Sequence, residues 1–331
     1  MRRGDNRMEM RSYILRKIVY LLITLFAIIA FNFFLFRIMP GDPTRVLVPR
    51  SNDPELRKAV MEKFYLDHPL HEQFTHYLYQ VFTLDFGFSV TVSKNAPIND
   101  MLGPPIINTV LLLGVGTILA IWIGVALGRA AAWRRGKFAD TFGMAFALTF
   151  YSMPTFLFAL IMVMVFGGWL QWFPIGGPYS LDYQDMNILG KIWDRIYHLI
   201  LPVTAFTIEV MAEYALIMRN SLTDVLTEDY IITARAKGLS NKAILHDHAM
   251  RNAMLPVVTV AAISFGWAIG GDIMVEIVFN YKGLGLLTWD AVSARDFPVL
   301  QAVFLIMSIT VLVGNFFADI IYMYLDPRVH V

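Results

Sequence analysis

The chain has 331 residues, of which 57% are hydrophobic and only 16% are charged. Soluble domains carry roughly 45–50% apolar and about 25% charged residues, so this composition indicates an integral membrane protein. The net charge of +1 gives no overall basic field and argues against binding to nucleic acid. Cysteine is absent, which excludes disulfides, thiolate metal sites, iron–sulfur clusters and cysteine nucleophiles.

Six apolar segments are long enough to cross a bilayer, which takes about 20 apolar residues per helix. They cover residues 18–36, 106–127, 142–166, 199–218, 257–278 and 299–322. The first follows a basic N-terminal stretch, but its apolar run is too long for a signal peptide and no small-residue cleavage site follows, so we expect an anchor. The sequence therefore predicts an all-α membrane protein with six transmembrane helices, built as a single domain over residues 1–331.

Basic residues are distributed unevenly between the two sets of loops. Sixteen Lys and Arg residues belong to the two termini and the loops after the second and fourth spans, against four in the loops after the third and fifth spans. Cytoplasmic loops carry the excess of Lys and Arg, so we expect both termini to be cytoplasmic in a multi-pass protein of the cell membrane. The segment 40–105 is then an external insertion.

This insertion contains an amphipathic helical pattern. Its apolar positions are Phe74, Tyr77, Leu78 and Val81. Their i, i+3, i+4, i+7 spacing places them on one helical face, in short helices broken at Pro69. Two interpretations remain open, a cap packed on the outer end of the bundle and a platform for an external partner.

A long polar stretch lies between the fourth and fifth spans and ends at Pro256, where we expect the chain to return to the membrane. Residues 222–237 have a helical pattern, and Gly238 is placed to end that helix in the left-handed conformation. Ser240 can cap a second helix over residues 241–252. Such a helix–glycine–helix unit is a compact surface for another protein, although a plain connecting loop is the alternative.

The same stretch resembles the coupling loop of ABC importer permeases, more specifically that of the oligopeptide/dipeptide permease family. The resemblance lies in the segment 234–240 (ARAKGLS), in His248, in residues 251–253 (RNA) and in the later Leu255-Pro256. Of the Glu-Ala-Ala element of the general permease motif, only the last residue matches, at Ala234.

Further motifs extend the resemblance to that family over nearly the whole chain. They are RIMPGDP at 37–43, LDHPL at 66–70, DFGFS at 85–89, Glu276 with Phe279, GLG at 283–285, RDFP at 295–298 and DPR at 326–328. The chain departs from the family pattern at Tyr65 and Leu84, where glycine is usual, and at Lys282, where proline is usual.

The resemblance implies a permease subunit of a binding-protein-dependent importer, in which the coupling loop (219–256) docks on one of two cytoplasmic ATPases. A second homologous permease and an external substrate-binding protein complete the implied assembly. The sequence has no G-x-x-x-x-G-K-[ST] motif, so ATP and Mg are expected on the partner subunits, with no cofactor on this chain and no enzyme activity of its own. Permeases of this family carry di- and oligopeptides and related systems carry oligosaccharides or nickel, which leaves the substrate open.

On this interpretation two sets of residues in the coupling loop meet the ATPase. The set expected to insert into it is Ala234, Gly238, Leu239, Ile244 and Leu245. The set expected to fix its register by charge is Arg235, Lys237 and Arg251.

Two pairs of carboxylates lie within the predicted spans, where ionisable groups are costly and usually functional. Glu209 and Glu213 are four residues apart, as are Asp272 and Glu276, so each pair can lie on one helix face along a hydrated translocation path. The alternative is that they lie near helix ends or pair with basic neighbours. Separately, Gly124-x-x-x-Gly128 is either a close helix contact or a chance match.

Other functional classes find less support in the sequence. His246 and His248 are two residues apart and point to different sides of a helix, which argues against a metal site. A stand-alone secondary transporter or channel is expected to show inverted repeats, and the two halves of this chain lack visible similarity. A membrane-embedded enzyme needs convergent catalytic groups, and no G-x-S-x-G element is present.

Overall fold

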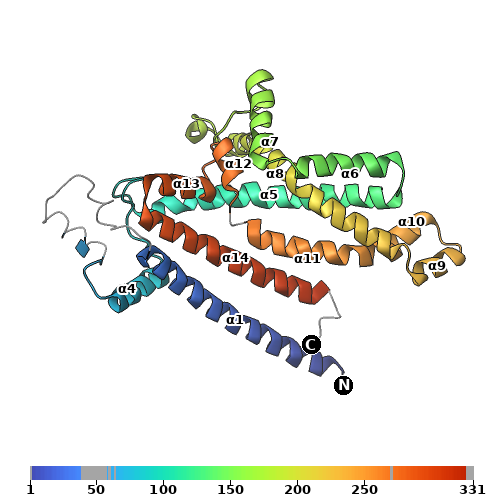
Figure 1. Cartoon of the computed structure of the whole chain (residues 1–331), viewed down its shortest axis with the longest axis horizontal. Helices are drawn as coiled ribbons and strands as arrows, with labels where there is room; N and C mark the ends of the chain where they lie inside the picture. Colours follow the sequence, from blue (N-terminus) through green and yellow to red (C-terminus); the bar gives the residue numbers. More distant parts are fainter. Residues whose placement is uncertain (1, 39–57, 59–60, 63–64, 269–270, 326–331) are drawn as a thin grey trace. The chain divides into compact units, whose positions relative to one another are not determined.

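The computed structural model describes residues 2–38, 58, 61–62, 65–268 and 271–325. Within these residues the chain is helical, and the only strand-like pairing is an isolated bridge between Phe88 and Pro97 (Figure 1). The chain divides into two compact units. Unit 1 comprises Met1–Ile107 and Gly283–Leu312, and unit 2 comprises Asn108–Lys282 and Val313–Val331.

The described helices include four that are long and apolar enough to cross a membrane. They contain the segments Ile14–Arg37, Ile98–Trp133, Ile188–Val225 and Phe297–Phe317. A fifth span results if Asp140–Tyr151 and Thr155–Trp169, which are bent by 99° at a short break, count as one. The predicted all-α membrane protein is confirmed, and four of the six predicted segments lie within these single helices.

Unit 1 contains α1 (Arg2–Ile38), α4 (Leu70–Thr83), α13 (Leu284–Ala294) and the adjoining parts of α5 (Ile98–Trp133) and α14 (Phe297–Leu325). The helix α4 begins directly after Pro69, as predicted, and ends at Leu84 in the left-handed conformation. Its buried residues Tyr77 and Val81 pack in one cluster with Phe33 of α1. The predicted apolar face is therefore used for packing within the unit, which agrees with the cap interpretation.

A buried carboxylate joins two distant segments of unit 1. Asp296, between α13 and α14, has no exposed surface. Its Oδ2 atom accepts hydrogen bonds from the Ser89 hydroxyl at 2.6 Å and from the backbone N–H groups of Val90, Thr91 and Val92 at 2.9, 2.9 and 3.0 Å. The contact joins the DFGFS motif to the RDFP motif, and its two residues, Ser89 and Asp296, are 207 positions apart in the sequence.

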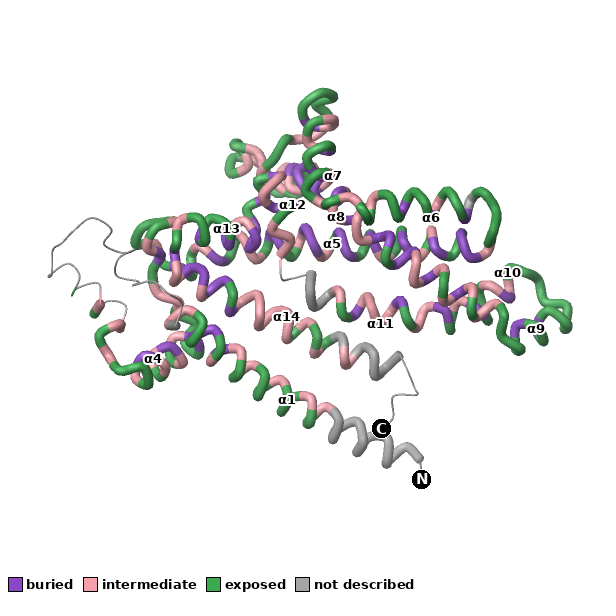
Figure 2. The backbone as a smooth tube through the Cα atoms, in the orientation of Figure 1, coloured by how far each residue is buried: buried purple, intermediate pink, exposed green. Residues whose placement is uncertain are grey.

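Unit 2 contains the remaining helices. These are α6 (Phe138–Tyr151), α7 (Thr155–Met162), η1 (Val163–Trp169), η2 (Tyr183–Asp185), α8 (Ile188–Val225), α9 (Asp229–Ala236), α10 (Asn241–Ala243), η3 (Ile244–Ala249), α11 (Met250–Ala268) and α12 (Ile273–Val278). Buried residues concentrate along α8, which packs on α6, α7 and α11, whereas much of α6 is exposed (Figure 2).

Glycines let α5 approach α8 closely within unit 2. A Cβ atom added at Gly124 would lie 2.5 Å from the carbonyl oxygen of Met211, and one at Gly128 would overlap the carbonyl oxygen of Ala215. Only residues without a side chain fit at these two positions. The Gly124-x-x-x-Gly128 motif is therefore a helix contact rather than a chance match.

Two predicted spans are broken in the structure. The segment 142–166 is divided at the end of α6, because Pro154 has no N–H to continue the ladder and instead precedes α7. The segment 257–278 is divided between α11 and α12, since Gly271 has a φ of +85° and the Asp272 side chain caps a new helix. The prediction of continuous helices over these two segments is wrong.

Candidate functional site

The loop between α8 and α11 has the predicted glycine turn. The helix α9 ends at Lys237, and Gly238 follows with a φ of +78°, a conformation that favours glycine. The Ser240 hydroxyl then accepts a hydrogen bond from the Ala243 N–H at 3.3 Å, which is the predicted helix cap. The helix–glycine–helix interpretation of this loop is therefore confirmed.

The helix boundaries in this loop differ from the prediction. Residues 222–237 are not one helix, because α8 continues to Val225 and a turn separates it from α9. The second helix does not end at residue 252. It continues from α10 through the π-helical segment η3 into α11, and Pro256 lies inside α11. Membrane helices tolerate such an internal proline, so the loop is continuous with the helix that follows it.

The predicted ATPase-contact residues separate into a buried and an exposed group. Ala234 is only 5% exposed and Ile244 is fully buried, in a cluster that also contains Leu222 of α8 and Ala253 of α11. Residues 231, 234 and 244 are apolar and belong to this one buried cluster, so they form the core of the loop. In this chain Ala234 and Ile244 are therefore buried, and their expected contact with an ATPase stays a prediction. Leu245 is half-buried at the edge of the same cluster.

The exposed group presents both charge and apolar surface. Gly238, Arg235, Lys237 and Arg251 are exposed, and Leu239 is 40% exposed. The structure adds two apolar side chains that the sequence interpretation missed, Ile232 at 57% and Tyr230 at 39% exposure. Both are next to the buried Ile231 in the chain and therefore point to another face of α9. This helical spacing could have identified them as exposed from the sequence. Exposed apolar side chains beside basic ones are typical of a protein-docking surface.

A partly buried ion pair joins the start of α6 to α8. The Arg219 guanidinium donates to both oxygens of Asp140, with Nε to Oδ1 at 2.6 Å and a terminal nitrogen to Oδ2 at 2.9 Å. The Gly136 N–H donates to the same Oδ2 at 3.0 Å, and Asp140 is 3% exposed. This bidentate geometry is specific to arginine and carboxylate, and the sequence interpretation missed it.

The first pair of carboxylates lies on α8. Glu209 is half-buried, and its Oε1 accepts a hydrogen bond from the Thr155 hydroxyl of α7 at 2.5 Å. Glu213 is exposed in this single chain. Both glutamates belong to α8 and are four residues apart, so they lie on one face of this helix as predicted.

The second pair is arranged differently from the prediction. Asp272 precedes α12 and accepts from the N–H groups of Met274 and Val275, both at 3.1 Å, so it acts as a helix cap. Glu276 is fully buried and its Oε1 accepts from the Thr109 hydroxyl of α5 at 2.7 Å. Glu276 therefore joins α12 to α5 within unit 2, and its role in a translocation path stays a prediction.

His246 and His248 are both exposed on η3. Among the residues that the structure describes, no three His, Cys, Asp or Glu side chains group as they would around a metal ion.

The fold defines an all-helical membrane protein in the part of the chain that the structure describes. A model of the family described as the "Binding-protein-dependent transport system inner membrane component" matches residues 100–331, and the N-terminal model of the same system matches residues 10–98. The chain belongs to this family. Its predicted membership of the ABC importer permeases of the oligopeptide/dipeptide type is confirmed.

Individual relatives agree over almost their full lengths. The chain is 36% identical to the oligopeptide transport system permease protein AppB of Bacillus subtilis over 321 residues, 97% of this chain and 99% of that protein. It is 35% identical to the glutathione transport system permease protein GsiC of Escherichia coli K12 over 320 residues, with the same coverage.

Solved structures support the fold. An inward-facing crystal structure of the MetNI methionine ABC transporter contains a chain that matches with a TM-score of 0.53 at 17% identity. The match covers 69% of this chain and 97% of that chain.

Proposed function

We propose that this chain is the permease subunit that forms part of the translocation path of an ABC importer for short peptides. The observation that carries the proposal is the end-to-end similarity to permeases named for oligopeptide and glutathione transport, both of which are peptides. An importer for oligosaccharides or nickel is the alternative within the same class. A stand-alone secondary transporter does not agree with membership of a binding-protein-dependent family.

The proposed assembly contains a second homologous permease, two cytoplasmic ATPases that bind ATP and Mg, and an external substrate-binding protein. In the membrane, this chain has six spans, with the breaks between α6 and α7 and between α11 and α12 inside two of them. Both termini and the coupling loop (219–256) are cytoplasmic, and the insertion 40–105 is external.

The exposed surface of the coupling loop is the proposed ATPase contact. Its apolar part consists of Tyr230, Ile232 and Leu239, and its basic part of Arg235, Lys237 and Arg251. The buried residues beneath it belong to the same core as α8 and α11, so movement of the loop also moves those helices. This shared core is the physical basis for transmitting ATPase motion to the membrane helices.

The test is peptide-stimulated ATP hydrolysis and uptake by the complete complex in proteoliposomes. We expect stimulation by short peptides presented by the binding protein, and stimulation by oligosaccharides or nickel alone would refute the substrate class. The double variant Ile232→Ala/Leu239→Ala is expected to lose ATPase co-purification and uptake together. The control is Ile23→Ala on α1, which removes a side chain of similar exposure, 60%, from a different helix. Full ATPase binding by the double variant would refute the assigned contact surface.

A further inference from the structure

Unit 1 contains a cavity of about 280 Å³ that none of the features above uses. Its walls come from the end of α1, from α4, from the 85–88 segment and from the start of α14. Ligand pockets commonly measure 300–1,000 Å³, so this volume suits a small ligand. In the proposed orientation the cavity is at the external end of these helices.

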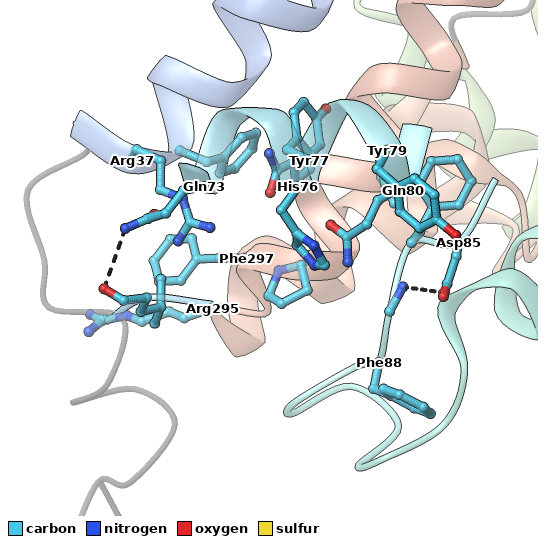
Figure 3. A pocket seen from close by; sticks show the side chains of 17 residues that line it. Arg37, Gln73, His76, Tyr77, Tyr79, Gln80, Asp85, Phe88, Arg295 and Phe297 are labelled. Carbon is cyan, nitrogen blue, oxygen red and sulfur yellow. Dashed lines mark hydrogen bonds between the residues drawn. The ribbon is translucent and has the colours of Figure 1, made fainter. Parts of the chain in front are cut away.

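The charged groups of the cavity are separated by sign. Arg37 and Arg295 lie on one side of the cavity and Asp85 lies on the other, with His76 and Gln80 between them (Figure 3). A ligand with a negative group at one end and a positive group at the other would match this order. A peptide with free termini is such a molecule, since its carboxylate and ammonium groups are at opposite ends.

The charged groups are available to a ligand. The ion pairs among the described residues include neither arginine, and the Arg37 guanidinium lies over the Phe33 ring, 5.6 Å from its centroid. Asp85 uses one oxygen, Oδ1, to accept from the Gly87 N–H at 3.1 Å, and its side chain belongs to an exposed residue. A guanidinium can therefore take a carboxylate in the bidentate geometry, and Asp85 retains an oxygen for an ammonium group.

The remaining walls are suited to a peptide chain between the two ends. The amides of Gln73 and Gln80 and the imidazole of His76 offer polar atoms, and the rings of Phe36, Tyr77, Phe86, Phe88 and Phe297 offer apolar contact. Burial raises the pKa of Tyr77 to about 12, so its phenol stays neutral.

The cavity is held in shape before any ligand enters. Asp296, between the wall residues Arg295 and Phe297, holds the chain just after Phe88 through Ser89 and three backbone N–H groups. On the opposite wall the Gln73 side chain donates to the carbonyl oxygen of His68 at 2.7 Å. Such preorganisation lowers the cost of binding.

We propose that this cavity binds a short peptide in its zwitterionic form, with the carboxylate at Arg37 and Arg295 and the ammonium group at Asp85. The inference rests on the proposed peptide-importer function and adds a site on the permease itself, separate from the substrate-binding protein.

The experiment measures binding of radiolabelled trialanine to the complete transporter complex in lipid nanodiscs without the substrate-binding protein. Three probes are compared, namely trialanine, its N-acetylated form and its C-terminal amide. We expect saturable binding of trialanine, with each modified form at least about tenfold weaker, because each loses one charge-assisted contact.

The variants assign each end of the ligand. Arg37→Gln is expected to weaken trialanine binding about tenfold and to remove the difference between trialanine and its amide. Asp85→Asn is expected to remove the difference between trialanine and its N-acetylated form. Lys94→Gln and Asp100→Asn are matched controls, because both residues are exposed in the same part of unit 1 and neither lines the cavity.

Several results would overturn the inference. They are equal binding of all three probes and unchanged trialanine binding by the Arg37 and Asp85 variants. A third is weaker binding of the C-terminal amide without weaker binding of the N-acetylated form, because a site that binds only anions would give this result. Uptake with the binding protein present is measured in parallel. Peptide uptake without direct binding would reject this site and leave the proposed function intact, whereas absence of peptide uptake would reject the proposed function.

Discussion

Replacement of Asp296 tests whether one buried carboxylate holds the chain segment that follows Phe88. Its Oδ2 atom accepts hydrogen bonds from the Ser89 hydroxyl and from three consecutive backbone N–H groups, at 2.6 to 3.0 Å. The Asp296→Ala variant removes these four contacts and also the one from the Val299 N–H to Oδ1 at 3.4 Å. The Asp296→Asn variant keeps a neutral oxygen of the same size and removes the charge.

The structure allows an estimate of the effect. A hydrogen bond to a charged group contributes about 1.5–3 kcal/mol, and a donor left without a partner in a buried site costs about 1–3 kcal/mol. The three N–H groups are partly buried, so water can replace part of the loss. We therefore expect local opening to become easier by about 1–3 kcal/mol, which corresponds to roughly 5- to 150-fold faster amide exchange. Asparagine should give a smaller increase, because charge-assisted bonds are about twice as strong as neutral ones.

The assay is hydrogen–deuterium exchange of the purified complex, followed by mass spectrometry of peptides that cover residues 88–97. Asp100→Asn is the control, since it removes a carboxylate from an exposed position on nearby α5. If exchange in Asp296→Ala stays within about twofold of the unmodified protein, the carboxylate does not hold this segment and the reasoning is refuted.

The pH dependence of the same signal has a definite sign. Burial raises the pKa of Asp296, but the hydrogen bonds from Ser89 and the backbone outweigh burial and hold this pKa below its ordinary value of 3.8. A carboxylate with a depressed pKa stabilises the fold fully above the unfolded value and loses the effect as pH falls through the folded value. Protection, corrected for intrinsic exchange rates, should therefore stay constant from about pH 7 to about pH 4. A loss of protection already between pH 6 and about pH 5 would contradict this assignment.

The remaining predictions concern unit 2. Gly128→Ala should prevent close packing of α5 on α8 and lower the yield of folded complex. Gly114→Ala is the control and should leave the yield unchanged, because no atom lies within 4 Å of the added Cβ. Equal yields from the two variants would contradict the helix contact. Asp140→Ala should destabilise the complex by about 1–3 kcal/mol because the partly buried Arg219 loses its charged partner. Adding Arg219→Met should recover most of the loss in thermal unfolding; no recovery would show that the ion pair itself is not the cause. Gly238→Ala should cost about 1–2 kcal/mol in stability through its left-handed φ of +78° and reduce coupled uptake; a variant of unchanged stability and uptake would show that the turn adapts.

Local signals in the sequence predicted most of the helical framework. Apolar length identified the four long helices, the i, i+3, i+4 spacing identified the packed face of α4, and Gly238 with Ser240 identified the turn between α9 and α10. These features depend on residues close together in the chain. The break after α11 is also marked locally, by Gly271 and the capping Asp272, but the apolar length of the whole segment 257–278 outweighed these two residues in the prediction.

The candidate site shows the limit of this reasoning more clearly. Ala234 matches the family pattern, and the resemblance of the whole loop led to the expectation that both Ala234 and Ile244 contact a partner. Both side chains are buried against α8 and α11, because a loop of this size needs its own apolar core. Which face of α9 is exposed depends on what packs beneath it, and that information lies in other helices.

By itself the sequence determined that this is a membrane protein, where its long helices lie and to which family it belongs, since composition, periodicity and motifs can be read without knowing the tertiary structure. The tertiary structure alone decided which distant groups meet: Asp296 with Ser89, Asp140 with Arg219, and the charged residues around the cavity of unit 1. The physical reason is that a buried charge must find a partner, and the partner is chosen by the packing of helices rather than by proximity in the chain.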